Sequence, residues 1–228
     1  MSILPSSRRA AVASATAVVA LAPATAHARL LSFGSTLRAR ANAKQARQAD
    51  AAYWQTKLRG GVSPRAPAAG RIRSFKVKGI ALSSWRAGLV GGERMFQLQA
   101  LRKRPDGSYR VLVTSQAFFL PGVGTDPQKI TTFRPTNFRI RKGDSLVFNT
   151  VGGWDGIASG DGPFPLGTPL QISSRVSGAT IAAYTKAGGT NNGAVLRGKS
   201  LAAHELLMRA TVGTGANATG PCPGGTGT

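Results

Sequence analysis

The sequence predicts an all-β fold: an antiparallel β-sandwich of jelly-roll type, with about eight to ten strands and little helix. From residue 71 to residue 151, apolar residues alternate with polar ones, which is typical of half-buried strands. Turn signals rich in Gly, Pro and Asp separate these runs. The single cysteine, Cys222, cannot form an intramolecular disulfide, so stability must come from a packed core.

The N-terminal segment predicts a secretory signal peptide over residues 1–28. Arg8 and Arg9 precede an apolar run from 10 to 22, and Ala26-His27-Ala28 forms a small-x-small cleavage site. The apolar run is shorter than the roughly 20 residues that a membrane-spanning helix needs. We therefore expect no membrane span after cleavage and a secreted protein, either extracellular or loosely attached to the cell surface.

Residues 36–58 leave two interpretations open. Their alanine, arginine and glutamine content and the Gly60-Gly61 stop favour a helix. The apolar positions form no clean stripe, however, so a basic loop over 36–52 is the alternative.

Four strands follow from the alternation of apolar side chains. Phe75 and Val77 share one face of the first strand, and the stretch 96–100 places Phe, Leu and Ala on one face of the second. Val111 and Val113 are expected to share a face of the third. Arg104-Pro105-Asp106-Gly107 predicts a hairpin before it, because proline favours the first turn position and glycine accepts a left-handed conformation. The fourth, 204–212, reads as a closing strand.

The stretch 137–148, NFRIRKGDSLVF, predicts two strands around a tight turn at Lys142-Gly143-Asp144. Phe138, Ile140, Leu146 and Phe148 are its expected core positions. Asp144 in the turn, like Asp106 in the hairpin, is expected to cap backbone amides. This stretch is interpreted as the corner of a sheet.

The C-terminal third is less regular. Residues 169–176 and 179–185 could each be a strand, and the glycine-rich segment 188–199 is expected to be a mobile loop. Residues 213–228 are predicted to be a disordered Gly/Thr/Pro-rich tail. The predicted organisation is a single domain over 29–212 between the signal peptide and this tail.

Several short motifs resemble a group of uncharacterised secreted bacterial β-sandwich proteins, similar in build to jelly-roll carbohydrate-binding modules. The motifs are FGSTL at 33–37, YWQTKL at 53–58, APAAGRIRSFKVKG at 66–79, FQLQALRKRPDGSYRVLVTS at 96–115, ITTFRPTNFRIRKGDSLVF at 130–148 and ELLMRATV at 205–212. The resemblance implies that FGSTL and YWQTKL are edge strands joined by a basic loop. It carries information about the fold and almost none about function.

The charge predicts an anionic partner. The chain has 30 Lys and Arg against 8 Asp and Glu, a formal net charge of +22, which favours salt-dependent attraction to anionic polymers. The basic surface expected from strand alternation comprises Arg71, Arg73, Arg102, Lys103, Arg104, Arg139, Arg141 and Lys142. Nucleic acid is disfavoured, because aromatic residues are only 7% of the chain and are not interleaved with the arginines, and because export is expected.

No cofactor or metal is expected. Blue copper needs two histidines and a cysteine, and zinc sites need several such ligands, whereas one histidine, His204, and one cysteine, Cys222 in the predicted tail, follow the predicted cleavage site. A Ser-His-Asp hydrolase is disfavoured because His204 begins an apparent strand and no G-x-S-x-G elbow occurs.

The loop GGWDGIASGDGPFPLG is the best candidate for ligand contact. Trp154 could stack on a sugar ring while Asp155 accepts hydrogen bonds, but the favoured interpretation is that Trp154 packs as core and Asp155 organises a turn. Asp155 and Asp161 are the only plausible carboxylate pair for a glycosidase or a calcium site, and both of those interpretations are disfavoured.

These observations predict a secreted, non-enzymatic β-sandwich that binds an extracellular or cell-envelope polymer, either a polysaccharide or an anionic wall component. The alternatives are a hydrolase acting on glycans through Asp155 and Asp161, and a structural envelope protein with no specific ligand.

Overall fold

Antiparallel strands make up almost all of the regular structure. The computed structural model describes residues 28–45, 51–82, 95–150, 170–186 and 188–215. Fourteen strands form two sheets, with one short 3-10 turn, η1, at Arg59–Gly61. The predicted all-β antiparallel sandwich is confirmed. The strands outnumber the eight to ten expected because four of them contain only two or three residues, too few to show an alternating pattern.

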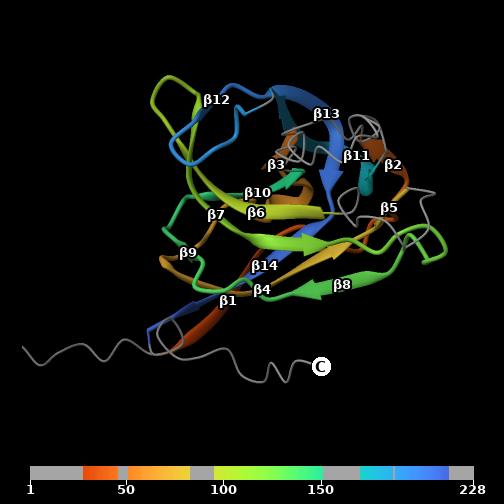
Figure 1. Ribbon diagram of the computed structural model, residues 1–228, viewed down its shortest axis with the longest axis horizontal. Helices are drawn as coiled ribbons and strands as arrows, with labels where there is room; N and C mark the ends of the chain where they lie inside the picture. The colour runs from red at the N-terminus through yellow and green to blue at the C-terminus, as the bar shows by residue number, and fades with distance from the viewer. Residues whose placement is uncertain (1–27, 46–50, 83–94, 151–169, 187, 216–228) are drawn as a thin grey trace, which may run out of the picture.

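The smaller sheet, here sheet A, has five strands and lies along the lower side of Figure 1. Its order is β1-β14-β4-β8, and the short strand β9 pairs with the N-terminal end of β4. The strands are β1 (Arg29–Gly34), β14 (Met208–Thr214), β4 (Gly70–Lys78), β8 (Ile130–Phe133) and β9 (Arg139–Ile140).

The larger sheet, here sheet B, has nine strands in the order β12-β7-β6-β10-β3-β11-β13, with β2 and β5 paired to β11. The strands are β12 (Val195–Leu196), β7 (Tyr109–Phe119), β6 (Met95–Lys103), β10 (Ser145–Thr150), β3 (Ala51–Lys57), β11 (Leu170–Thr185), β13 (Lys199–Leu206), β2 (Ala43–Gln45) and β5 (Ile80–Ala81).

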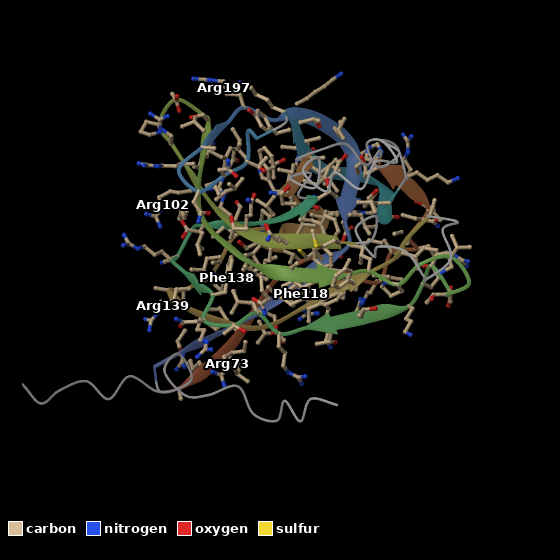
Figure 2. The ribbon with its side chains drawn as sticks, in the orientation of Figure 1. Arg73, Arg102, Phe118, Phe138, Arg139 and Arg197 are labelled. Carbon is tan, nitrogen blue, oxygen red and sulfur yellow. The ribbon has the colours of Figure 1, made fainter. Side chains whose placement is uncertain are left out.

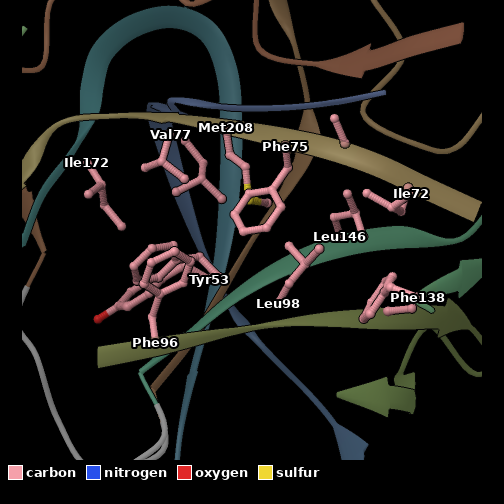
Figure 3. Packing of buried hydrophobic residues seen from close by; sticks show 14 of the residues in the cluster. Tyr53, Ile72, Phe75, Val77, Phe96, Leu98, Phe138, Leu146, Ile172 and Met208 are labelled. Carbon is pink, nitrogen blue, oxygen red and sulfur yellow. The ribbon is translucent and has the colours of Figure 1, made fainter. Parts of the chain in front are cut away.

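The main core lies between the two sheets (Figure 3). Phe75 from β4 stacks on Phe133 from β8, with ring centroids 5.1 Å apart. Phe96 from β6 stacks on Phe148 from β10 at 4.2 Å. The expected inward positions of these strands are confirmed, since Phe75, Val77, Phe96, Leu98 and Ala100 are fully buried.

The hairpin predicted at 104–107 joins β6 to β7, but its two valines face different clusters. Val113 packs against the main core, whereas Val111 packs in a second cluster with Trp54. The prediction that they share a face is wrong because the register shifts between them. Ala100 lies opposite Val113 and Leu101 opposite Val111, so β7 carries an extra residue, a β-bulge.

The corner predicted at 137–148 is confirmed. Phe138, Ile140, Leu146 and Phe148 are all buried in the main core. The chain passes from β9 in sheet A to β10 in sheet B through a turn in which Gly143 has φ 85°, a left-handed conformation that favours glycine. The turn therefore connects the two sheets at one end of the sandwich.

The N-terminal segment is not a helix, and it agrees with the expected basic loop as far as residue 42, where β2 follows at Ala43–Gln45. The described residues 36–45 and 51–58 contain no α-helix. FGSTL belongs to edge strand β1 only as far as Gly34, and YWQTKL is not an edge strand, because β3 lies between β10 and β11 in the middle of sheet B. Its burial on both faces explains the error: Trp54 is fully buried in the second cluster while Tyr53 faces the main core.

The C-terminal strands are also rearranged. The two predicted strands at 169–176 and 179–185 form one long strand, β11, whose pairing with β13 shifts between Arg175 and Thr180. The predicted closing strand over 204–212 is split, because the chain leaves sheet B at Leu206 and enters sheet A at Met208. Leu207, at the crossing, is buried and bonds through its main chain to Ile172 and Lys78. Strand β14 continues to Thr214, two residues beyond the predicted domain end.

The segment 188–199, predicted to be a mobile loop, folds over the outer face of sheet B. Val195 and Leu196 pair with β7 as β12, and Thr190 is 3% exposed. Thr190 accepts hydrogen bonds from the side-chain amides of Gln99 and Asn149. The loop thereby covers the second hydrophobic cluster around Trp54.

Two predictions about the ends concern residues mostly outside the described part. Of the predicted signal peptide, only Ala28 is described, and of the predicted tail, only 213–215. Within the described residues, no helix has the length and apolar character needed to cross a membrane.

Candidate functional site

The corner between the sheets carries a groove lined by arginines. Its volume is about 630 Å³, and Arg102 from β6, Arg139 from β9 and Arg141 from the corner turn contribute its charged side chains. The other lining residues are Ala69, Gly70, Leu112, Val113, Asn137, Ile140 and Asp144. We call this the arginine groove. Figure 2 shows Arg102 and Arg139 on the same side of the molecule, near β9 and the β6–β7 hairpin.

Asp144 organises the arginine groove. Its carboxylate accepts two hydrogen bonds from the Arg102 guanidinium, from Nε at 2.9 Å and from Nη2 at 3.0 Å. The same carboxylate accepts the main-chain N–H of Arg141 at 2.9 Å. The side chain of Asp144 is only 2% exposed, whereas that of Arg102 is 39% exposed. The fork geometry fixes the guanidinium against the corner turn and ties sheet B to it.

The pairing determines the charge of the groove. The hydrogen bond to Asp144 raises the pKa of the Arg102 guanidinium above its already high usual value, and the adjacent carboxylate offsets its positive charge. Arg139 and Arg141 are exposed, and among the described residues Asp144 is the only carboxylate that lines the groove. Within that described part of the wall, no acid is left to compensate the charges of Arg139 and Arg141.

The outer surface of sheet A extends this positive charge. None of its five strands contains an aspartate or a glutamate. Two pairs of basic residues lie directly opposite each other on neighbouring strands: Arg71 and Arg139 on β4 and β9, and Lys76 and Arg209 on β4 and β14. Residues directly opposite in an antiparallel sheet share a face, and like charges there lower stability. We call this surface the basic face.

A second groove lies at the Lys76 end of the basic face. Its volume is about 430 Å³, and it is lined by Ser32, Thr36, Leu37, Lys76, Ile130, Arg209 and Thr211. The hydroxyls of Ser32 and Thr211 lie 3.3 Å apart. Lys76 and Arg209 are both exposed. This groove, here the hydroxyl groove, thus combines two cations with three hydroxyls.

The eight predicted basic residues do not all converge. Arg102, Arg139 and Arg141 line the arginine groove, and Arg71 lies opposite Arg139. Lys142 is exposed in the corner turn next to Arg141, and Arg73 occupies the bulge of β4. Lys103 and Arg104 lie apart, in the exposed β6–β7 hairpin.

The hairpin has its own local electrostatics. Asp106 accepts hydrogen bonds from the main-chain N–H of Ser108 at 3.1 Å and from its hydroxyl at 2.6 Å. These bonds, with the nearby Arg104 and Arg197, lower the pKa of the Asp106 carboxyl. Arg197 also forms an ion pair with Asp106 at 2.9 Å. The predicted capping roles of Asp106 and Asp144 are both confirmed, but the Arg102 partner of Asp144 was not predicted.

The loop predicted to contact ligand is not described. Trp154, Asp155 and Asp161 lie outside the described residues, so their roles stay predictions. Among the residues that the structure describes, no group of three or more His, Cys, Asp or Glu side chains is placed to hold a metal ion.

His204 and Glu205 do not act together in the described fold. The Nδ1 atom of His204 lies 2.8 Å from the main-chain oxygen of Ala202, on its own strand. Glu205 is buried and accepts a hydrogen bond of 2.5 Å from the hydroxyl of Ser35. Neighbouring residues of a strand point to opposite faces, which separates the two groups.

Sequence reasoning missed the pairing of Lys76 with Arg209. Strand alternation does place both side chains outward, but they lie 133 positions apart in the chain, and only the pairing of β14 with β4 brings them together. Lys78, two residues after Lys76, departs from this alternation. It is buried, and its Nζ donates to the main-chain oxygens of Leu37 at 3.2 Å and Ala39 at 2.8 Å.

No protein-family model, curated protein sequence or solved structure matches the chain. The resemblance to secreted β-sandwich proteins with the build of carbohydrate-binding modules therefore stays a hypothesis.

Proposed function

We propose that this protein is a secreted, non-enzymatic β-sandwich that binds an anionic polymer of the cell envelope or the extracellular space through the arginine groove. The observation that carries the proposal is the charge of that groove. Arg139 and Arg141 line it, and the one carboxylate among its described lining residues already binds Arg102. Planar guanidinium groups suit phosphate, sulfate and carboxylate oxygens, which they can hold through paired hydrogen bonds.

The geometry supports binding more than catalysis. Arg102 is held by a bidentate bond and Asp144 is buried, so the groove offers a fixed wall and two adaptable cations. A glycosidase needs two carboxyl groups that flank the scissile bond, whereas among the described lining residues Asp144 is the single carboxylate of this groove. Leu112, Val113 and Ile140 provide apolar wall beside the arginines, as expected where a chain with a carbon backbone lies along the surface.

The test is co-sedimentation of the protein with isolated cell-wall material and with insoluble polysaccharides, over a series of salt concentrations. The groove variant is the double substitution Arg139→Gln and Arg141→Gln. The matched control is Arg175→Gln with Lys199→Gln, which removes the same charge from exposed positions on β11 and β13. Both variants lower the net charge equally, so a difference between them reports position.

We expect the wild type to bind wall material at low salt and the groove variant to lose at least tenfold in affinity. The dependence of log K on log salt should also become shallower by about one to two, since each lost ionic contact contributes slightly less than one to the slope. Equal loss in the control variant would mean that net charge alone attracts the polymer. Retention that resists high salt and falls on Trp154→Ala would instead favour the predicted sugar site in the segment GGWDGIASGDGPFPLG.

A further inference from the structure

We infer that the basic face is a second binding region for the same ligand, so that the protein binds a linear chain of repeated anionic groups across the arginine groove and the hydroxyl groove together. This inference rests on the proposed function and specifies the chemical class of the ligand. Binding across both grooves requires a polymer that carries several charges and several hydroxyls along its chain, rather than a single anion or a neutral glycan.

Strand β4 connects the two grooves. Arg71, near its N-terminal end, lies opposite Arg139 of the arginine groove, and Lys76, near its C-terminal end, lies opposite Arg209 of the hydroxyl groove. Five residues of strand span roughly 16 Å at 3.3 Å per residue, and the bulge at Arg73 shortens this to about 15 Å. Both pairs lie on the outer side of sheet A, so one extended chain can contact both.

The like-charged pair of Lys76 and Arg209 points to an anion between its two members. A cation opposite a cation in neighbouring strands costs stability, on the order of a few tenths of a kcal/mol. A sheet surface held together by ion pairs would carry carboxylates beside Lys76 and Arg209, whereas the strands of sheet A contain no Asp or Glu. A phosphate, sulfate or carboxylate group bridging Lys76 and Arg209 removes the repulsion, and Ser32, Thr36 and Thr211 can donate hydrogen bonds to it.

The composition of the face favours a glycan or polyol chain over a nucleic acid. The phenylalanines of sheet A, Phe33, Phe75 and Phe133, belong to the main core or pack against it, so they offer no outward ring for stacking bases. Single-stranded nucleic acids are held largely by such stacking. Hydroxyls beside the cations instead match a ligand that carries hydroxyls between its charges.

The experiment measures affinity against ligand length, using heparin-derived oligosaccharides as the probe and isothermal titration at low salt. The series runs from a disaccharide to fragments well longer than the separation of about 15 Å between the grooves. A fragment that reaches both sites gains from effective concentration, so we expect affinity to rise by about 10- to 100-fold once that length is passed. Oligo-dT of matching lengths serves as the nucleic-acid arm.

The double substitution Lys76→Gln and Arg209→Gln should remove the rise with length and leave the affinity for the disaccharide within about twofold. The control, Arg175→Gln with Lys199→Gln, should keep the rise. Replacing Lys76 and Arg209 by glutamine removes the repulsion between two like charges, so it should not lower the melting temperature of the free protein. An unchanged melting temperature therefore separates lost binding from lost folding.

A rise that survives in the Lys76 and Arg209 variant would overturn the inference while leaving the proposed function intact. Oligo-dT binding as tightly as the oligosaccharides would overturn the assignment to a glycan or polyol chain. If no oligosaccharide binds at any length at low salt, and wall material is not bound either, the proposed function itself fails.

Discussion

Replacing Asp144 by asparagine should destabilise the fold measurably, because this one carboxylate holds the corner between the sheets. The substitution keeps the shape of the side chain but removes its charge and one acceptor. Three hydrogen bonds depend on it, two from Arg102 and one from the main chain of Arg141. An amide nitrogen in place of an oxygen also faces a donor at one of these positions.

The expected cost is about 2–3 kcal/mol of the free energy of unfolding. A hydrogen bond to a charged group contributes about 1.5–3 kcal/mol, and breaking a buried ion pair costs about 3–5 kcal/mol. The lower part of this range applies, because Arg102 is 39% exposed and its guanidinium regains water when the carboxylate is lost. For a domain of this size, that cost lowers the melting temperature by roughly 4–10 °C.

The assay is urea denaturation of a double-mutant cycle made of Asp144→Asn, Arg102→Met and both together. We expect a coupling energy of about 1–2 kcal/mol, since the two side chains are in direct contact. Asp126→Asn is the matched control, because the exposed Asp126 accepts a single main-chain hydrogen bond, from Gln128 at 2.8 Å. A cost for Asp144→Asn no larger than that of the control, together with negligible coupling, would refute the structural role of the pair.

Two further predictions concern the core and a close backbone contact. Burial raises the pKa of Tyr53 from 10.0 to about 12, so above pH 10 the unfolded chain ionises this residue first and stability falls, by up to about 2–3 kcal/mol from this group. Denaturant unfolding between about pH 9 and 11 should therefore show a shallower fall for Tyr53→Phe than for the wild type, and equal slopes would contradict the burial of the hydroxyl. Gly79→Ala should cost about 2–4 kcal/mol, because φ is +134° and a methyl group would meet the main-chain oxygen of Gln171. Thermal unfolding of Gly60→Ala, where φ is +75° and the space is open, gives the control, and a similar cost for both would mean that Gly79 can move away.

The sequence was informative wherever one side chain's surroundings follow from its neighbours. The alternation of apolar residues correctly predicted the class of fold, the buried faces of β4 and β6, and the corner around Gly143. The turn residues correctly predicted the hairpin between β6 and β7 and the capping by Asp106 and Asp144. Each of these features depends on contacts within a few residues, which a local pattern records.

The local pattern misled where one strand is buried on both faces or changes its register. Strand β3 has Trp54 in the outer cluster and Tyr53 in the main core, so its sequence lacks the alternation that separates a central strand from an edge. A single extra residue in β7 moved Val111 to the opposite face from Val113. The continuous apolar run around Leu207 concealed a passage from one sheet to the other.

The sequence by itself determined that the protein is an all-β sandwich with a large excess of positive charge, because alternation and composition are properties of the chain. Only the tertiary structure decided which charges meet. Arg102 and Asp144 lie 42 positions apart, and Lys76 and Arg209 lie 133 apart, so strand order and register alone bring opposite charges together in the first pair and like charges together in the second. A like-charged pair on a sheet is invisible in a linear pattern, since the pattern records which way each side chain points and not what lies opposite it.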